Sequence, residues 1–348
     1  MNKFKYYFIL LLAGIAMVSC NKDNDDPEVV PLRDYKEQYK ADNDSIVKYL
    51  KTYYIEEVNA NFDVKITKIP AGGTQVSIWD QKVYPLQSRD VYSNDVTYKV
   101  YYLTLRKGTG ISPCNYDAIS AAYSGSLLDG KTVFDSSYGL ARSFNLESVI
   151  EGWSEIFPLF KTGTSTTAAN GVITYDNFGA GVMFIPSGLG YYGSGQADIP
   201  AYSPMVFSFK LFNVQRLDHD LDGVYDFQED INHDGYVYDF RNTTRYPNFP
   251  KELIDDTDSD GIADFVDTDD DGDGYTTFLE ITKPTGAPNT GLSKYYPFDP
   301  VTDNPNTPNV DETETYGIPA FAATGEPDYT SPGRLRIHVD KAHHTAKP

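Results

Sequence analysis

The sequence has 348 residues, enough for two modest domains, and a formal charge of −21. That charge argues against nucleic-acid binding, because phosphate contacts need clusters of lysine and arginine, and it disfavours docking of a basic face onto anionic lipid. Strong acidity can accompany disorder, but 14% of the residues are aromatic, and the 28 tyrosines with frequent glycine and proline favour short strands and ordered loops.

The first twenty residues predict an export signal. Lys3 and Lys5 precede an apolar run that is too short to span a bilayer and that ends in Met-Val-Ser-Cys. This ending resembles the lipobox of bacterial lipoproteins. The resemblance implies that Cys20 is lipidated and anchors the protein to a membrane of the cell envelope, on its periplasmic or its outer face. The alternative is a soluble exported protein in which Cys20 has no role. The other cysteine is Cys114, so we expect no intramolecular disulfide framework.

Two segments precede the main β-rich part. Residues 21–33 are polar and contain proline, which predicts a flexible tether. In residues 34–96 we expect an extension with a helix over 42–55, because Ile46 begins an apolar stripe at helical spacing and Asp42 with its neighbours is a candidate N-cap. The strand-like pieces that follow carry no role that the sequence identifies.

Residues 97–215 have β character and contain four stretches with aromatic side chains at loop edges. These are "YSGSLLDGKTVFDSS" at 123–137, "RSFNLESVIEGWSE" at 142–155, "VMFIPSGLGYYGSG" at 182–195 and "IPAYSPMVFSFKLFNV" at 199–214. In turn they predict a hairpin with an Asp-Gly turn, a short helix opening near Val149, a Pro-Gly loop and a closing strand. Taken singly, each is consistent with the aromatic core of an ordinary β-rich domain.

In this order, the four stretches resemble FKBP-type peptidyl-prolyl isomerases. The matching parts are the hairpin that ends in Phe-Asp-Ser-Ser, "VIEGW", "IPSGLGYYG" and the Ile-Pro pair before the last strand. The resemblance implies an α+β fold, in which a twisted antiparallel sheet wraps around a short helix with an apolar pocket between them. It also implies an isomerase of proline-containing polypeptide clients that needs no catalytic cofactor.

The resemblance also assigns the residues of the pocket. Trp153 would form the floor, and Asp135 would be a buried carboxylate beside the client. The Ile150 N–H and the Tyr191 hydroxyl would donate hydrogen bonds to client carbonyl groups, with Tyr192 as the alternative to Tyr191. The walls and the loop edge are assigned to Tyr123, Phe134, Val149, Ile150, Phe207 and Ile199.

Three features depart from the family's pattern. Arg142 stands where the family has an aromatic residue, Leu140 replaces an arginine, and an insertion separates Lys161 from Val182. These departures favour a second hypothesis, in which the same fold holds proline-containing segments or chaperones without useful turnover. No histidine lies between residues 97 and 215, which argues against a histidine-dependent hydrolase built within this region.

Residues 218–280 contain acidic loops with the spacing of a calcium site. Such a loop supplies oxygen ligands from positions 1, 3, 5, 9 and 12 and has glycine at position 6. Three loops fit, and a fourth that starts at Asp230 has Arg241 in place of an acid at position 12. The predicted calcium ligands are Asp218, Asp220, Asp222, Asp226 and Glu229; Asp256, Asp258, Asp260, Asp264 and Asp267; and Asp269, Asp271, Asp273 and Glu280.

The acidic loops resemble thrombospondin type 3 and EF-hand-like repeats, which implies structural Ca²⁺, little regular secondary structure and a stiffened spacer. The alternative is a solvated acidic linker. A third functional hypothesis is a calcium-dependent surface interaction protein that uses the isomerase fold as a platform. Residues 281–348 predict a linker rich in proline and asparagine, followed by a basic tail whose charge suits docking on the acidic loops.

Overall fold

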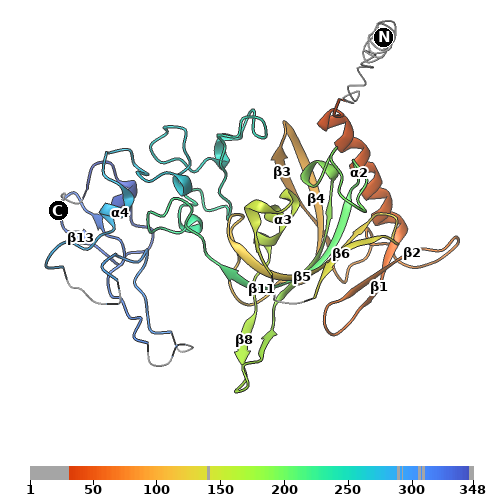
Figure 1. Cartoon of the computed structure of the whole chain (residues 1–348), viewed down its shortest axis with the longest axis horizontal. Coiled ribbons are helices and arrows are strands. Elements are labelled where there is room, and N and C mark those ends of the chain that lie inside the picture. The colour runs from red at the N-terminus through yellow and green to blue at the C-terminus, as the bar shows by residue number, and fades with distance from the viewer. Residues whose placement is uncertain are drawn as a thin grey trace, which may run out of the picture. The chain divides into compact units, whose positions relative to one another are not determined.

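A computed structural model describes residues 31–138, 142–287, 291, 293–304, 307 and 310–344 (Figure 1). The chain divides into two units, Met1–Arg33 and Asp34–Pro348, and every element below belongs to the second. The expected signal peptide with Cys20, most of the expected tether, and Leu140 lie outside the described residues. Within the described part of the chain, no helix combines the length and the apolar character needed to cross a membrane.

An antiparallel sheet of seven strands forms the centre of the second unit. The strand order is β3-β4-β10-β11-β5-β6, and β7 pairs with β5. This arrangement confirms the predicted antiparallel sheet of an α+β fold. The strands are β3 (Leu86–Ser93), β4 (Val96–Arg106), β5 (Ala118–Leu127), β6 (Val133–Ser137), β7 (Ser143–Asn145), β10 (Gly179–Ile185) and β11 (Met205–Gln215).

The helices α2 (Tyr35–Thr52) and α3 (Glu151–Ile156) cover opposite faces of the sheet (Figure 1). Strand β10 shows the division, because its side chains alternate between the two faces. Met183 belongs to the core on the α3 side, and its neighbour Val182 belongs to the core on the α2 side. Because β10 is buried on both faces, every one of its residues is buried.

Helix α2 begins earlier than the sequence predicted. Its N-cap is Asp34, whose carboxylate accepts a hydrogen bond from the N–H of Glu37 at 2.9 Å, and the helix ends at Thr52. The expectation that Asp42 or its neighbours cap this helix is wrong. Asp42 lies buried within the helix, where its carboxylate accepts hydrogen bonds from the N–H and the hydroxyl of Ser187 at 2.7 and 2.6 Å.

The segment that we expected to be an extension contributes directly to the sheet. Strand β3 pairs with β4 along its whole length, as the edge strand. Two further strands, β1 (Tyr53–Val58) and β2 (Val64–Lys68), form a separate hairpin directly after α2. The isomerase-like fold therefore includes residues that precede 97.

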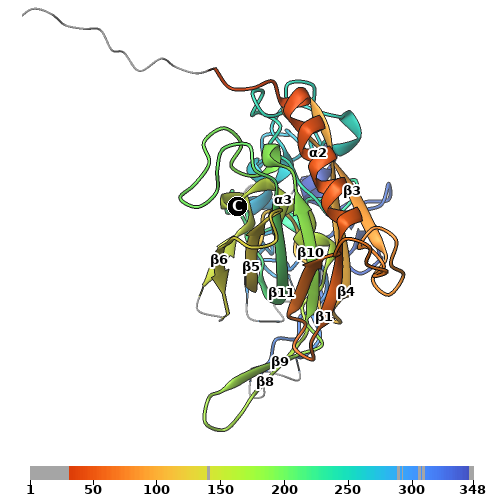
Figure 2. The same cartoon turned by 90° about the vertical axis from the view of Figure 1, so that its right-hand side faces the viewer.

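The insertion after Lys161 forms a second separate hairpin. It consists of β8 (Thr164–Thr167) and β9 (Ile173–Asp176), and Figure 2 shows it extending away from the sheet. Short 3₁₀ turns complete the regular structure at Leu146–Ser148, Phe157–Leu159, Ser187–Leu189, Asp226–Gln228, Lys251–Leu253, Asp264–Val266 and Ile337–Val339.

The acidic loops contain little regular structure, but the region after them is packed. It holds the short helix α4 (Thr277–Glu280) and the two-residue strands β12 (Ala320–Phe321) and β13 (Pro327–Asp328). The segment 281–315, which the sequence predicts to be a linker or an extended loop, has little regular structure but is not a free linker, because aromatic and aliphatic side chains from scattered positions form a common core. The buried members of that core are Val224, Ile281, Tyr296, Ile318 and Ile337.

The same region is also held by ionic and aromatic contacts. Lys283 forms a buried ion pair with Glu314, and the guanidinium of Arg336 lies 3.5 Å from the ring centre of Phe298. The expected docking of the tail on the acidic loops is confirmed. His344 stacks on Tyr275, with ring centres 4.2 Å apart. These contacts join residues that have no repeating spacing, so no periodic pattern in the sequence predicts them.

The contact between α2 and the loop at Ser187 can be tested by unfolding. Asp42→Ala is expected to lower the free energy of unfolding by about 2–3 kcal/mol, because a charged acceptor is lost and the two Ser187 donors stay buried without it. Urea unfolding followed by circular dichroism measures the change. Asp44→Ala, on the exposed side of the same helix, is the matched control and is expected to change stability by less than ~0.5 kcal/mol. Equal effects of the two substitutions would contradict the bracing role of Asp42.

Candidate functional site

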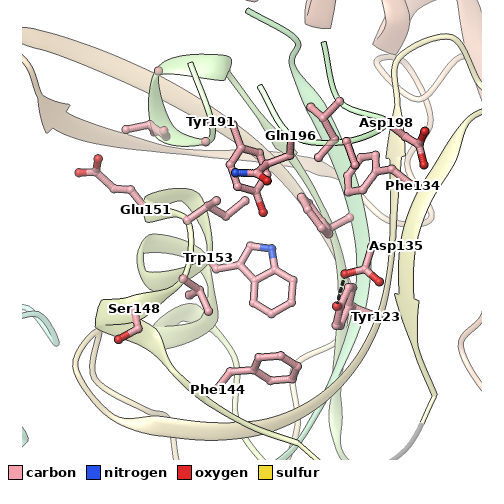
Figure 3. A pocket seen from close by; sticks show the side chains of 18 of the residues that line it. Tyr123, Phe134, Asp135, Phe144, Ser148, Glu151, Trp153, Tyr191, Gln196 and Asp198 are labelled. Atoms are coloured by element: carbon pink, nitrogen blue, oxygen red, sulfur yellow. Dashed lines mark hydrogen bonds between the residues drawn. The ribbon is translucent and has the colours of Figure 1, made fainter. Parts of the chain in front are cut away.

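A cavity of about 700 Å³ lies between α3 and the sheet (Figure 3). All nine residues that the sequence assigned to a pocket line it, although they come from stretches far apart in the chain. Figure 3 shows Trp153 at the centre, with Tyr123 and Asp135 on the side of the sheet and Glu151 on the side of the helix. The nine residues are Tyr123, Phe134, Asp135, Val149, Ile150, Trp153, Tyr191, Ile199 and Phe207.

The floor of the cavity is aromatic. Trp153 is 4% exposed, and its ring centre lies 4.8 Å from that of Tyr123 and 5.3 Å from that of Phe207, both edge to face. The buried indole N–H has no hydrogen-bond partner among the residues described. The floor is therefore aromatic, with one polar N–H that no described residue binds.

A hydrogen bond joins the sheet strands at the edge of the cavity. The Tyr123 hydroxyl on β5 donates to Asp135 Oδ2 on β6 at 2.6 Å. Burial, and then this bond to a carboxylate, raise the pKa of Tyr123 to about 12. The expectation that Asp135 is buried is wrong, since β6 is the last strand in the sheet order and Asp135 is exposed there.

The two candidate tyrosines of the Pro-Gly loop have different surroundings. Tyr191 lines the cavity, and burial followed by the charge of Asp135 raises its pKa. Tyr192 is outside the lining and stacks on Tyr35 of α2, with ring centres 4.1 Å apart. The geometry therefore favours Tyr191 as the hydroxyl donor. The loop that carries it follows Ser187, the residue held by Asp42.

Three charged residues of the cavity, Glu151, Asp198 and Arg245, were missed by the sequence reasoning. Glu151, the first residue of α3, forms an ion pair at 2.7 Å with Arg245, which belongs to the acidic-repeat region and also lines the cavity. Burial raises the pKa of Glu151 to about 7, and the charge of Arg245 acts against this rise. Arg142, a departure from the family's pattern, is exposed and outside the lining.

The acidic loops bring carboxylates together in three groups, with the oxygens of each group within 4.8 Å of one another. Most members were predicted from the loop spacing, and one was not. The groups are Asp220, Asp222, Glu229 and Asp270; Asp256, Asp258 and Asp260; and Asp269, Asp271 and Asp273.

The unpredicted member is Asp270, which reaches the first loop from the third. Asp222, Glu229 and Asp270 are each at most 3% exposed, and buried oxygens of all three lack a hydrogen-bond donor among the described residues. Burial and then the charge of Asp222 raise the pKa of Asp270 well above its usual range. Four crowded carboxylates, each with at least one buried oxygen that lacks a donor, form an oxygen-only ligand set, which fits a hard cation such as Ca²⁺.

The remaining predicted ligands lie outside these groups. Both oxygens of Asp226 are engaged by His219, and both oxygens of Asp264 accept from the N–H and hydroxyl of Thr257 at 2.8 and 2.7 Å. These position-9 carboxylates thus brace their own loops. Of the other three predicted ligands, Asp218 and Asp267 accept backbone N–H groups, and Glu280 lies close to the third carboxylate group without belonging to it.

Those other residues differ in their contacts. Asp218 accepts from the N–H groups of Leu221 and Gly223, and Asp267 accepts from the N–H of Asp269. Burial and then the charges of the third group raise the pKa of Glu280 to about 9.

The fourth loop closes in a way that its own spacing does not indicate. Asp255 accepts hydrogen bonds from the N–H groups of Ile231 and Asn232 at 3.1 and 3.2 Å, while Arg241, at position 12, pairs with Asp239.

Comparison with known proteins links the two regions to different families. The family described as BamM C-terminal matches residues 219–309, which include the acidic loops. The FKBP-type peptidyl-prolyl cis-trans isomerase FkpA of Escherichia coli (strain K12) is 27% identical over 168 residues, covering 46% of this chain and 56% of that protein. The outer membrane protein MIP of Legionella longbeachae is 38% identical over 66 residues, covering 18% of this chain and 28% of that protein.

Among solved structures, a peptidyl-prolyl cis-trans isomerase of Pseudomonas syringae pv. tomato is 20% identical with a TM-score of 0.32, covering 54% of this chain and all of that one. The chain spans about half the length of the first curated relatives that it matches. Part of the chain is therefore homologous to FKBP-type peptidyl-prolyl isomerases.

Proposed function

We propose that the protein is a peptidyl-prolyl cis-trans isomerase that acts on proline-containing segments of exported polypeptides. The observation that carries the proposal is the convergence of nine residues, from stretches far apart in the chain, on one cavity with an aromatic floor. Homology to FKBP-type isomerases supports the same activity.

The cavity suits the physical demand of this reaction. Rotation about an X–Pro bond crosses a barrier of ~18–20 kcal/mol, because amide resonance is lost on the way. The apolar surface of Trp153 disfavours the more polar planar amide relative to the twisted one. The Ile150 N–H and the Tyr191 hydroxyl then hold client carbonyl groups while the bond turns. No bond is broken, so neither a nucleophile nor a catalytic cofactor is required.

A second candidate function is binding of proline-containing segments without turnover. It is favoured by the exposure of Asp135, which leaves the carboxylate beside the cavity open to solvent. Both candidates use the same cavity, so they differ in whether the bound bond is turned.

We infer further that the acidic loops bind Ca²⁺ as a structural ion. The support is the first carboxylate group, in which Asp220, Asp222, Glu229 and Asp270 are crowded and carry buried oxygens without donors. A bound cation would neutralise this repulsion and fix the positions of these carboxylates.

The activity is tested with a chromogenic Leu-Pro peptide. The protein is expected to accelerate its cis-to-trans conversion, and Trp153→Ala is expected to lower kcat/KM ~10-fold or more, equivalent to about 1.4 kcal/mol of transition-state stabilisation. Trp79→Ala is the matched control, because Trp79 packs against Tyr101 on the other face of the sheet. Full activity in a folded Trp153→Ala protein would refute the site, and peptide binding without acceleration would favour the second candidate.

The calcium assignment predicts how the free energy of unfolding depends on pH when no cation is bound. Burial raises the pKa of Asp220 to about 8 and that of Asp222 to about 7, so without a cation the folded protein holds protons that the unfolded chain has released above about pH 4. In chelator, the free energy of unfolding is therefore expected to fall as pH rises from about 5 to 8. Saturating Ca²⁺ should remove this slope and stabilise the fold by about 2.7 kcal/mol per site at 100 Kd.

Urea unfolding at several pH values, with Ca²⁺ or with chelator, measures both effects. Asp270→Asn is expected to reduce the stabilisation by Ca²⁺, whereas Asp311→Asn, at an exposed position away from the three groups, should leave it unchanged. An identical pH slope with and without Ca²⁺ would contradict the assignment.

The envelope location rests on the sequence pattern before Cys20. An export signal that ends in a lipobox supports lipidation of this cysteine and attachment to a membrane. Labelled palmitate is expected to enter the protein expressed in a lipoprotein-processing bacterium, and Cys20→Ala is expected to abolish the labelling. Equal labelling of both proteins would refute the anchor.

A further inference from the structure

A segment between the acidic loops grips the helix that carries Trp153. We call residues 236–246 the α3 clamp. At one end of α3, the hydroxyl of Tyr236 donates to the carbonyl oxygen of Glu155 at 2.8 Å, and the hydroxyl of Tyr238 donates to the Glu155 carboxylate at 3.2 Å. Glu155 is 1% exposed, so these contacts are buried.

Arg89 of the edge strand β3 completes this end of the grip. Its Nε donates to the Glu155 carboxylate at 2.9 Å, and its guanidinium lies 3.4 Å from the ring centre of Tyr236. The strand, the helix and the clamp are thus joined through one buried charge pair.

The clamp holds the other end of α3 through Arg245. This arginine pairs with Glu151 at 2.7 Å, while the hydroxyl of Ser93 donates to the second Glu151 oxygen at 2.9 Å. The carbonyl oxygen of Arg245 accepts from the N–H of Asn94 at 2.6 Å. Since Arg245 also lines the cavity, the clamp forms part of the cavity wall.

The contacts of the clamp are important because α3 is too short to be stable without tertiary contacts. It has six residues and carries the buried Glu155 and the largely buried Glu151, whose side chain is 9% exposed. A helix of this length gains its stability from tertiary contacts, and a buried carboxylate without a partner is strongly unfavourable. Trp153 lies between the two carboxylates, and Ile150 is the N-cap. Loss of Arg89 or Arg245, the partners of these carboxylates, would therefore shift Trp153 or the Ile150 N–H.

The clamp begins within the fourth acidic loop and ends before the second. Tyr236 follows the glycine at position 6 of the fourth loop, in which Asp230 accepts from the N–H groups of Asp234 and Gly235 at 3.1 and 2.8 Å. Asp255, the residue that closes this loop, directly precedes the second loop. Crowded carboxylates repel one another without a cation, so the anchoring of the clamp depends on what the loops bind.

We propose that the α3 clamp makes the affinity of the cavity for proline-containing peptides depend on divalent cations in the acidic loops, with Arg245 as the positioning residue that acts on α3 through Glu151. The inference rests on the proposed isomerase function for the identity of the peptide. It adds a residue from the repeat region to the binding machinery and gives the loops a role beyond that of a spacer.

The test compares peptide affinity and hydrogen exchange in Ca²⁺ and in chelator, using residues 21–348. Fluorescence anisotropy of a labelled Leu-Pro peptide gives Kd, and mass spectrometry gives the exchange of the 151–156 amides. Chelation is expected to weaken binding at least ~5-fold and to speed exchange in α3. Arg245→Met should weaken binding and speed this exchange even in Ca²⁺.

Arg241→Met is the matched control. Arg241 lies in the same clamp, but it pairs with Asp239 at the surface and does not line the cavity. It is expected to leave both readouts unchanged. A combined Glu151→Gln and Arg245→Met protein tests the mechanism, since removing the buried charge should restore much of the affinity that Arg245→Met alone loses. No restoration would mean that Arg245 contacts the peptide directly and would overturn its positioning role.

The outcomes separate this inference from the proposed function. Turnover and affinity that are the same in Ca²⁺ and chelator, with unchanged exchange in α3, would overturn the inference and leave the isomerase intact. Cation-dependent affinity and exchange without any acceleration of the peptide would support the inference and refute the isomerase.

Discussion

The buried carboxylate of Glu155 is the constraint on which the arrangement of this protein depends. A carboxylate that is 1% exposed must be paired, and its partners here are Arg89 from the edge strand and Tyr238 from the repeat region. Tyr236 fixes the carbonyl oxygen of the same residue. These partners come from separate parts of the chain. The contacts of the Glu155 carboxylate therefore hold α3 on the sheet and hold the repeat region on both α3 and the sheet.

The cavity is braced from two directions by segments outside the region that resembles the isomerase family. On one face of the sheet, Asp42 of α2 holds Ser187 and so places the loop that carries Tyr191. On the other, Arg245 and its neighbours hold the helix that carries Trp153. Since catalysis of bond rotation depends on groups held in fixed positions, these outer segments contribute to the site without belonging to its recognisable core.

The sequence predicted those parts of the site whose signals are local. The Asp-Gly turn, the Val-Ile-Glu-Gly-Trp helix start and the Ile-Pro loop are recognisable stretches, and their order resembles the isomerase family, so the resemblance assigned the residues on them to one pocket. Asp42, Arg245 and Asp270 were not assigned their roles, because each acts on a partner far away in the chain. An acid near a predicted helix start resembles a cap, and one-dimensional spacing does not show which side chains converge. The packed core after residue 281 was missed for the same reason, since its members follow no period.

The acidic loops show why a ligand frame taken from spacing alone is incomplete. In the first two matching loops, the carboxylate at position 9 accepts the N–H of the residue at position 2, and in the third the hydroxyl of Thr277 takes that place at 3.5 Å from the Asp270 nitrogen. Position 9 therefore shapes the turn. With its N–H directed to Thr277, Asp270 sends its side chain out of its own loop and into the first one. The carboxylate group of the first loop is then complete only when the third loop is folded, so the loops form one interlocked structure. Because the α3 clamp lies between the first and third loops in sequence, a change in cation binding at these loops would also alter the position of the clamp.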